Sequence, residues 1–199
     1  MNSEKSVRAF LAIEPPAEIL KEIGNIQNRL KKSIAADVRW TRPEGIHLTL
    51  KFFGNISESE IAAVSQVVEK HTAAFAPLQL EVKTLGVFPS LKRPRVLWIG
   101  LQGDTAPLVS LQKNLERGFE DCGFAREERP LRPHLTLGRI KAVKETAGLE
   151  KTIESGRDFA AGSFCAAGLA LFKSDLTPRG AVYTKLAWFP FGGKKEFQQ

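Results

Sequence analysis

The sequence predicts a fold of mixed helices and strands, built from two similar halves that pack about a pseudo-two-fold axis. Apolar residues alternate at strand spacing in some segments and recur at helical spacing in others. The motif His47-Leu48-Thr49-Leu50 also recurs as His134-Leu135-Thr136-Leu137, at an offset of 134 − 47 = 87 residues. The same offset takes Arg42-Pro43 onto Arg129-Pro130 and Arg8 onto Arg95. We therefore expect residues 1–199 to form one domain of two lobes, with the repeated motifs facing a shared cleft.

The first half is predicted to begin with a buried strand over residues 7–13. A helix follows the prolines at 15 and 16, because Ile19, Ile23, Ile26 and Leu30 fall on one helical face. An extended segment at 38–41 leads to a strand at 46–53. Ser57 and Glu60 have the spacing of a capping box, which predicts a helix start. The alternating stretch 78–87 predicts another strand.

The second half repeats this order from a strand predicted at 95–101. Asp104 is expected to cap a helix that buries Leu108, Leu111 and Leu115. A strand at 135–140 and a short helix at 144–155 follow. Residues 159–172 read as one strand, paired with 181–189 through the turn-rich segment 177–180.

Composition and charge restrict the class of protein. The net charge of +7 favours phosphate-rich partners such as nucleic acid. Cys122 and Cys165 have neither metal-ligand spacing nor a disulfide framework, so a reduced cytoplasmic protein is expected. The longest apolar run, 164–172, is too short to cross a bilayer, and no membrane role is expected. We predict a monomer with no cofactor and no metal.

The repeated motif has the residues that metal-free displacement at phosphorus needs. Residues two apart on a strand share a face, so His47 and Thr49 point one way and the two leucines point to the core. The same holds for His134 and Thr136. Histidine can give or take a proton near neutral pH, and a threonine hydroxyl can donate to a phosphate oxygen. One copy alone would be read as a histidine packed at a strand end, but two matched copies favour one shared site.

These motifs resemble the paired His-x-Thr-x motifs of the two-histidine phosphoesterases. Within them the chain is most similar to the RNA 2′,3′-cyclic phosphodiesterases of bacteria and archaea, also called 2′-5′ RNA ligases of the LigT type. The stretches that fit this pattern beside the motifs are Arg8–Ile13, Thr49–Gly54, Arg93–Trp98 and Arg132–Arg139. The resemblance implies a bilobal α+β fold, with an antiparallel sheet and flanking helices from each lobe.

The resemblance also implies that the chain hydrolyses the terminal 2′,3′-cyclic phosphate of RNA to a 2′-phosphate, with reversible 2′-5′ ligation left open. Carried over, His47 is the proton donor, His134 is the proton acceptor and Arg139 holds the phosphate. The residues alone would allow the two histidine roles to be exchanged.

Two other functions remain open at this point. One is an exonuclease or a 2′-5′ oligonucleotide phosphodiesterase that uses the same site, and the other is an RNA-binding module without catalysis. Of Phe52 and Phe53, only one can face the cleft, where it could stack on a base. Core packing is the favoured interpretation for either, and for Trp98.

Overall fold

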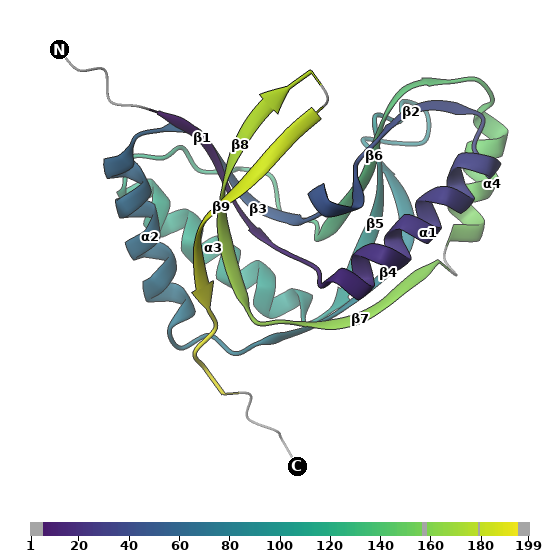
Figure 1. The fold of residues 1–199 in the computed structure, drawn as a ribbon. Coiled ribbons are helices and arrows are strands. Elements are labelled where there is room, and N and C mark those ends of the chain that lie inside the picture. The colour runs from purple at the N-terminus through teal and green to yellow at the C-terminus, as the bar shows by residue number, and fades with distance from the viewer. Residues whose placement is uncertain (1–5, 157–158, 179, 195–199) are drawn as a thin grey trace.

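The chain folds into two antiparallel sheets with helices on their flanks, an α+β arrangement (Figure 1). The computed structural model describes residues 6–156, 159–178 and 180–194. In chain order the elements are β1 (Val7–Ile13), α1 (Ala17–Ser33), β2 (Ala36–Trp40), the 3-10 helix η1 (Pro43–Gly45), β3 (Leu48–Ile56), α2 (Glu58–Thr72), β4 (Leu78–Phe88), β5 (Val96–Gly103), α3 (Thr105–Asp121), β6 (His134–Val143), α4 (Thr146–Ser155), β7 (Ala160–Ala166), β8 (Gly168–Thr177) and β9 (Gly180–Pro190).

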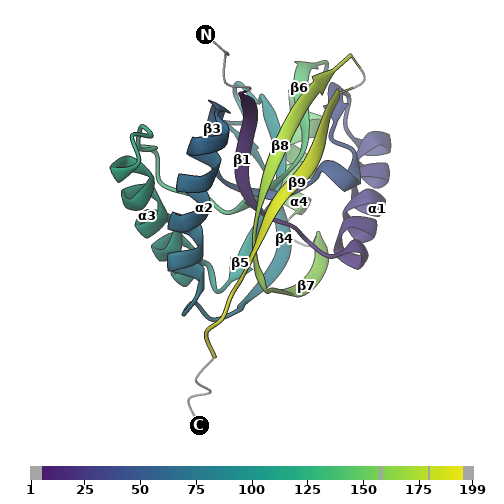
Figure 2. The same ribbon diagram turned by 60° about the vertical axis from the view of Figure 1, so that its left-hand side comes forward.

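Sheet A has the strand order β3-β1-β8-β9, and sheet B has the order β2-β6-β5-β4-β7. In Figure 2, β1, β8 and β9 run side by side across sheet A, as their antiparallel pairings require. Helices α2 and α3 lie together on one side of the molecule, and α1 and α4 lie on the other (Figure 1). The predicted arrangement of two lobes, each with an antiparallel sheet, is confirmed.

The internal repeat is present in the topology, with one strand exchanged between the halves. The offset of 87 residues places β1 on β5, α1 on α3, β3 on β6, α2 on α4 and β4 on β8. Sheet A contains β3-β1-β8, and sheet B contains the equivalent series β6-β5-β4. Strand β4 of the first half therefore completes the sheet of the second half, and β8 completes the sheet of the first. The repeat was predicted from the sequence, but this exchange was not.

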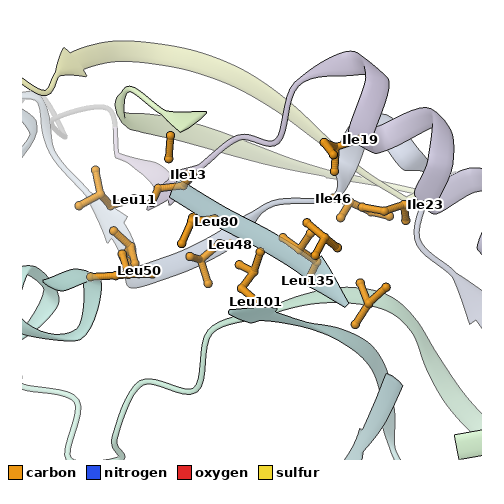
Figure 3. Close-up of a cluster of buried hydrophobic side chains, with 14 of the residues drawn as sticks. Leu11, Ile13, Ile19, Ile23, Ile46, Leu48, Leu50, Leu80, Leu101 and Leu135 are labelled. Atoms are coloured by element: carbon orange, nitrogen blue, oxygen red, sulfur yellow. The ribbon is translucent and has the colours of Figure 1, made fainter. Parts of the chain in front are cut away.

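One face of each sheet contributes to a common hydrophobic core (Figure 3). On sheet A the core side chains include Leu11 and Ile13 of β1 and Leu48 of β3, all almost completely buried. On sheet B they include Leu101 of β5 and Leu135 of β6. The leucines of both repeated motifs are buried as expected, so the histidine and threonine of each motif must point to the other face of their sheet.

Most of the predicted helices and strands are present, and two local predictions are wrong. The capping box of α2 is formed, because Ser57 Oγ accepts from the Glu60 amide and Glu60 Oε2 accepts from the Ser57 amide. Asp104 occupies the N-cap of α3, but its carboxylate caps no helix amide and accepts instead from the Gln79 amide at 2.7 Å. The single strand expected over 159–172 is two strands, since β7 pairs with β4 in sheet B and β8 pairs with β1 in sheet A. The residues around the change of sheet, 164–172, are all small or apolar, so the sequence shows no break there.

Candidate active site

His47 lies directly before β3, on the face of sheet A that is turned away from the common core. This open face of sheet A is formed by Phe10, Phe172 and Tyr183. The His47 ring stacks on Phe10 with centroids 4.5 Å apart and meets the edge of Tyr183 at 5.2 Å. Burial lowers the pKa of His47 to about 4, although a hydrogen bond with the Gly45 backbone opposes this shift. The ring is therefore mostly neutral at pH 7 when the site is empty.

His134 is the first residue of β6, on the corresponding open face of sheet B, which Phe88 and Trp98 form. Its ring meets the Phe88 ring edge-on at 4.9 Å and lies 6.2 Å from the Trp98 ring. Burial lowers the pKa of His134 as well, against an opposing hydrogen bond with the Arg132 backbone. The two histidines thus have the same kind of aromatic support, and both favour the neutral form.

Each ring is held by the backbone two residues earlier. His134 Nδ1 lies 2.6 Å from the Arg132 carbonyl oxygen. A carbonyl oxygen can only accept, so Nδ1 carries the hydrogen and the neutral ring has its lone pair on Nε2. His47 has the same partnership with Gly45, which is related to Arg132 by the offset of 87. Hydrogen bonds at equivalent positions therefore fix the orientation of both rings.

A β-bulge follows each motif threonine and changes which later side chains share its face. Leu50 has no partner on β1, because Ala12 pairs with Thr49 and Leu11 with Lys51. Leu137 has none on β5, because Trp98 pairs with Thr136 and Leu97 with Gly138. The extra residue reverses the alternation of the strand beyond it. The two bulges are again 87 residues apart.

The bulges bring Arg139 and Phe52 onto the open faces. Arg139 is exposed and lies on the side of His134 and Thr136, which strict alternation would not allow. Phe52 occupies the equivalent position on β3, is 57% exposed and lies 5.4 Å from the Phe10 ring. Core packing was the favoured prediction for Phe52, and that prediction is wrong because of the bulge. Phe53 does pack in the core, against Phe119 and Phe124.

The two open faces lie on the same side of the molecule. Strands β3 and β6 contact each other, and each has its motif histidine at or next to its first residue. Further along sheet B, Arg39 Nη2 extends to 3.9 Å from the position that a Cβ on Gly180 would occupy, at the tip of the β8–β9 hairpin of sheet A. These contacts bring the two open faces next to each other, with β3 and β6 adjacent.

Arg39 and Tyr183 belong to this region and were not identified from the sequence. Arg39 pairs directly with Arg139 across β2 and β6, so the two arginine side chains start from neighbouring positions on the open face. In the described part of the chain neither forms an ion pair. No motif marks Arg39, which only the pairing of β2 with β6 brings to the site. Tyr183 could have been noticed as the only tyrosine of the chain.

The Trp98 ring lies next to the His134 ring, with centroids 6.2 Å apart. Trp98 was expected in the core, but its ring is half-buried on the open face and packs over Gly86, where a Cβ would lie 2.1 Å from Cζ2. The indole Nε1 is buried and has no hydrogen-bond partner among the described residues.

Within the described ranges, no group of three histidine, cysteine, aspartate or glutamate side chains could hold a metal ion. No helix in the same ranges is long and apolar enough to cross a membrane.

The fold is that of a two-lobed protein with two similar halves, each of which contains one His-x-Thr motif. The family described as "LigT like Phosphoesterase" matches this chain twice, over residues 13–98 and 99–183. The chain belongs to this family, and each match covers one half of the repeat.

Known relatives align with this chain over almost their whole length. The chain is 34% identical over 183 residues to the RNA 2′,3′-cyclic phosphodiesterase of Methanothermobacter thermautotrophicus, covering 92% of this chain and 98% of the relative. It is 32% identical to the protein of that name in Aquifex aeolicus, covering 95% and 100%. A crystal structure of a Thermus thermophilus protein superposes with a TM-score of 0.77 at 26% identity, covering 94% of this chain and all of the other. Apo LigT of E. coli gives a TM-score of 0.73 at 23% identity, with coverage of 94% and 98%.

Proposed function

We propose that this protein hydrolyses the terminal 2′,3′-cyclic phosphate of RNA to a 2′-phosphate by proton transfer between two histidines. The observation that carries this proposal is the symmetric pair formed by His47 and His134, each oriented by a backbone hydrogen bond at the position two residues before it. Relatives matching nearly the whole chain are named RNA 2′,3′-cyclic phosphodiesterases, which supports the same substrate here.

In the proposed reaction His134 acts as the general base. Nε2 of the neutral ring takes a proton from water as the water oxygen attacks phosphorus. The bond between phosphorus and the 3′ oxygen breaks, and protonated His47 gives its proton to that oxygen. The products are a 2′-phosphate and a free 3′-hydroxyl. His134 then returns its proton to solvent and His47 takes one up, which restores the starting state.

The phosphate is held by groups around the two rings. Thr49 and Thr136 lie two residues beyond the histidines on the same faces and would donate to the non-bridging oxygens. Arg139 would bind the same phosphate or the next one, and Arg39 beside it adds a second positive charge. In this proposal both guanidinium groups stabilise the negative charge that develops during the reaction.

The lowered pKa of His47 has to be reconciled with its role as the acid. With an empty site and a pKa of about 4, few molecules at pH 7 carry the proton that the leaving oxygen needs. A bound phosphate is an anion close to the ring, and a nearby negative charge favours the protonated imidazole. We infer that the substrate itself raises the pKa of His47, so that His47 becomes an effective acid only in the complex.

The proposal is tested by replacing each histidine in turn. His47→Ala and His134→Ala should each lower the single-turnover rate by about 10²–10⁴-fold, because each removes one proton-transfer partner. The double variant should be scarcely worse than the slower single variant, since both rings serve one step. His71→Ala is the matched control, because His71 lies on α2 away from both motifs. The substrate is a short RNA with a 2′,3′-cyclic phosphate end, and the position of the product phosphate is mapped.

Two results would contradict the proposal. Retention of full hydrolysis by either motif variant would remove that histidine from the mechanism. RNA binding by the wild type without ring opening would favour a binding module. The rate should also be unchanged by a chelator, and loss of turnover restored by a divalent cation would replace proton transfer with metal chemistry.

Four further predictions accompany this function. We infer that residues 1–199 act as one two-lobed unit, that the protein is a monomer, that it works in the cytoplasm and that it needs no cofactor. Size determination in solution would test whether the protein is a monomer, and localisation of the tagged protein would test whether it works in the cytoplasm.

A further inference from the structure

Strand β9 presents an exposed tryptophan on the open face of sheet A. Trp188 is 46% exposed, although large apolar side chains are normally covered. Its ring lies over Gly168 of the neighbouring strand, where an added Cβ would be 2.7 Å from Cζ2. Trp188 also pairs with Ala170, so the residues beneath it are small. The ring is supported on one side by the sheet and is accessible on the other.

A cavity of about 360 Å³ adjoins this ring. One wall is the connection from β1 to α1, residues 13–16, and another is the junction of β7 with β8, residues 165–168. Trp188 and Lys185 form the rest of the lining. The cavity thus has an aromatic surface, a cation and backbone from two turns, which suits a flat heterocycle with polar edges.

The cavity continues the open face from His47. The Phe172 ring is 6.4 Å from the His47 ring, and Lys185 Nζ lies 5.9 Å above the Phe172 ring. The same ammonium lies 5.6 Å from the Trp188 ring. Lys185 therefore separates two aromatic surfaces, one next to the catalytic histidine and one next to the cavity.

The position of Lys185 is fixed by Glu14, whose Oε2 lies 2.5 Å from Nζ. The lysine side chain is still 46% exposed. An ion pair this exposed adds little stability, but it holds the ammonium between the two rings. A phosphodiester that joins a nucleotide at His47 to a base stacked on Trp188 would place its charge at this ammonium.

We propose that Trp188 and the adjoining cavity bind the nucleotide that precedes the terminal one in a single-stranded RNA. This inference rests on the proposed function, because it requires the cyclic phosphate to lie at the two histidines. The terminal nucleoside then lies beside His47, and its 5′ neighbour stacks on Trp188. Aromatic stacking tolerates any base, so the subsite selects for length and for an unpaired end rather than for sequence.

The test compares a cyclic mononucleotide with a dinucleotide. The substrates are adenosine 2′,3′-cyclic phosphate and ApA with a 2′,3′-cyclic phosphate end. Trp188→Ala should raise KM for the dinucleotide about tenfold, within the usual range for loss of one stacked base, and change KM for the mononucleotide less than about twofold. Trp188→Phe should keep most of the dinucleotide preference. Lys185→Ala should weaken the salt dependence of KM for the dinucleotide alone.

Val182→Ala is the matched control, because Val182 is an exposed apolar residue of the same strand that does not line the cavity. Unchanged mononucleotide turnover in Trp188→Ala shows that the variant is folded. Equal effects on both substrates, or no effect on either, would overturn the subsite.

A binding measurement keeps the subsite separate from the reaction. ApA with a 3′-phosphate should quench the tryptophan fluorescence of the wild type more than 3′-AMP does, and Trp188→Phe should remove the difference. If the wild type hydrolyses neither cyclic substrate, the proposed function fails, but the quenching measurement still shows whether the subsite binds a second nucleotide. Equal quenching by the two ligands would refute the subsite.

Discussion

A histidine that folding buries in its neutral form makes protein stability depend on pH. The pKa of His47 falls from the ordinary 6.5 to about 4 on burial. Between these values the unfolded chain binds more protons than the folded one, so the free energy of unfolding decreases as the pH falls from 6.5 towards 4. For one ring the slope is at most about 1.4 kcal/mol per pH unit.

We therefore expect His47→Gln to lose less stability on acidification than the wild type does. Urea unfolding at pH 6.5 and at pH 4.5 measures this, and the difference between the two proteins cancels the carboxylates that both contain. Equal losses of stability in the two proteins would show that folding does not lower the pKa of His47.

The same burial predicts how the reaction rate depends on pH. The profile of kcat/KM reports the free enzyme, and that of kcat reports the complex. Since the bound phosphate should raise the pKa of His47, the alkaline limb of kcat should lie at higher pH than the alkaline limb of kcat/KM. If the two alkaline limbs lie at the same pH, bound substrate does not raise the pKa of His47. The measured constants belong to the pair of histidines and not to either ring alone.

Arg39 and Arg139 form a cross-strand pair that folding alone does not favour. Like charges that face each other on a sheet are destabilising, and these two groups are direct partners. Arg39→Ala and Arg139→Ala should therefore leave stability unchanged or slightly higher, while each raises KM for RNA and flattens its salt dependence.

Arg117→Ala is the control, since Arg117 is exposed on α3. The measurements are thermal unfolding and KM at several salt concentrations. A fall in stability without a change in KM would show that the two arginines stabilise the fold and do not bind the RNA.

At the scale of the element, strand β3 is fixed to α3 by a buried ion pair. Lys51 Nζ donates to Glu116 Oε2 at 2.6 Å, and the two side chains are only 7% and 3% exposed. Lys51 also donates to the Ala125 carbonyl, and Glu116 accepts from the Glu127 amide. The pair thus holds the segment that leads from α3 towards His134.

Lys51→Met would leave Glu116 buried without its partner, and we expect a loss of about 3–5 kcal/mol in the free energy of unfolding. The double variant Lys51→Met with Glu116→Leu should recover most of that loss, because no unpaired charge remains. Chemical denaturation of the three proteins measures both values. A double variant as unstable as the single one would assign the loss to packing and not to charge.

The sequence predicted what depends on spacing within one element. Helical periodicity located α1 and α3, the capping box located the start of α2, and strand alternation assigned His47, Thr49, His134 and Thr136 to one kind of face. The bulges at Leu50 and Leu137 could not be predicted, because a bulge is defined by the partner strand. For the same reason the exposure of Phe52 and the presence of Arg39 at the site became known only from the structure. Arg139 was expected on the face of Thr136, and the bulge is what places it there.

At the scale of the whole molecule, the exchange of β4 and β8 makes each half depend on the other. A fragment ending at residue 91 would retain β1 and β3 without β8, and would leave β2 and β4 without their partners β6, β5 and β7. We expect fragments 1–91 and 92–199 each to be unfolded alone and to form a folded one-to-one complex when expressed together. Circular dichroism and size determination of each fragment and of the mixture measure this. A folded, stable single fragment would show that the halves are independent.

The exchanged strand also has a consequence for symmetry. A half-length chain with this topology would have an incomplete sheet and a single motif histidine, and two copies could complete their sheets only by each giving its last strand to the other. In such a symmetric pair both rings would have the same surroundings and the same affinity for a proton. A single chain has no such constraint, and here Tyr183 lies against the His47 ring while Trp98 lies near the His134 ring. The two rings can therefore differ in proton affinity, as the division into one acid and one base in the proposed mechanism requires.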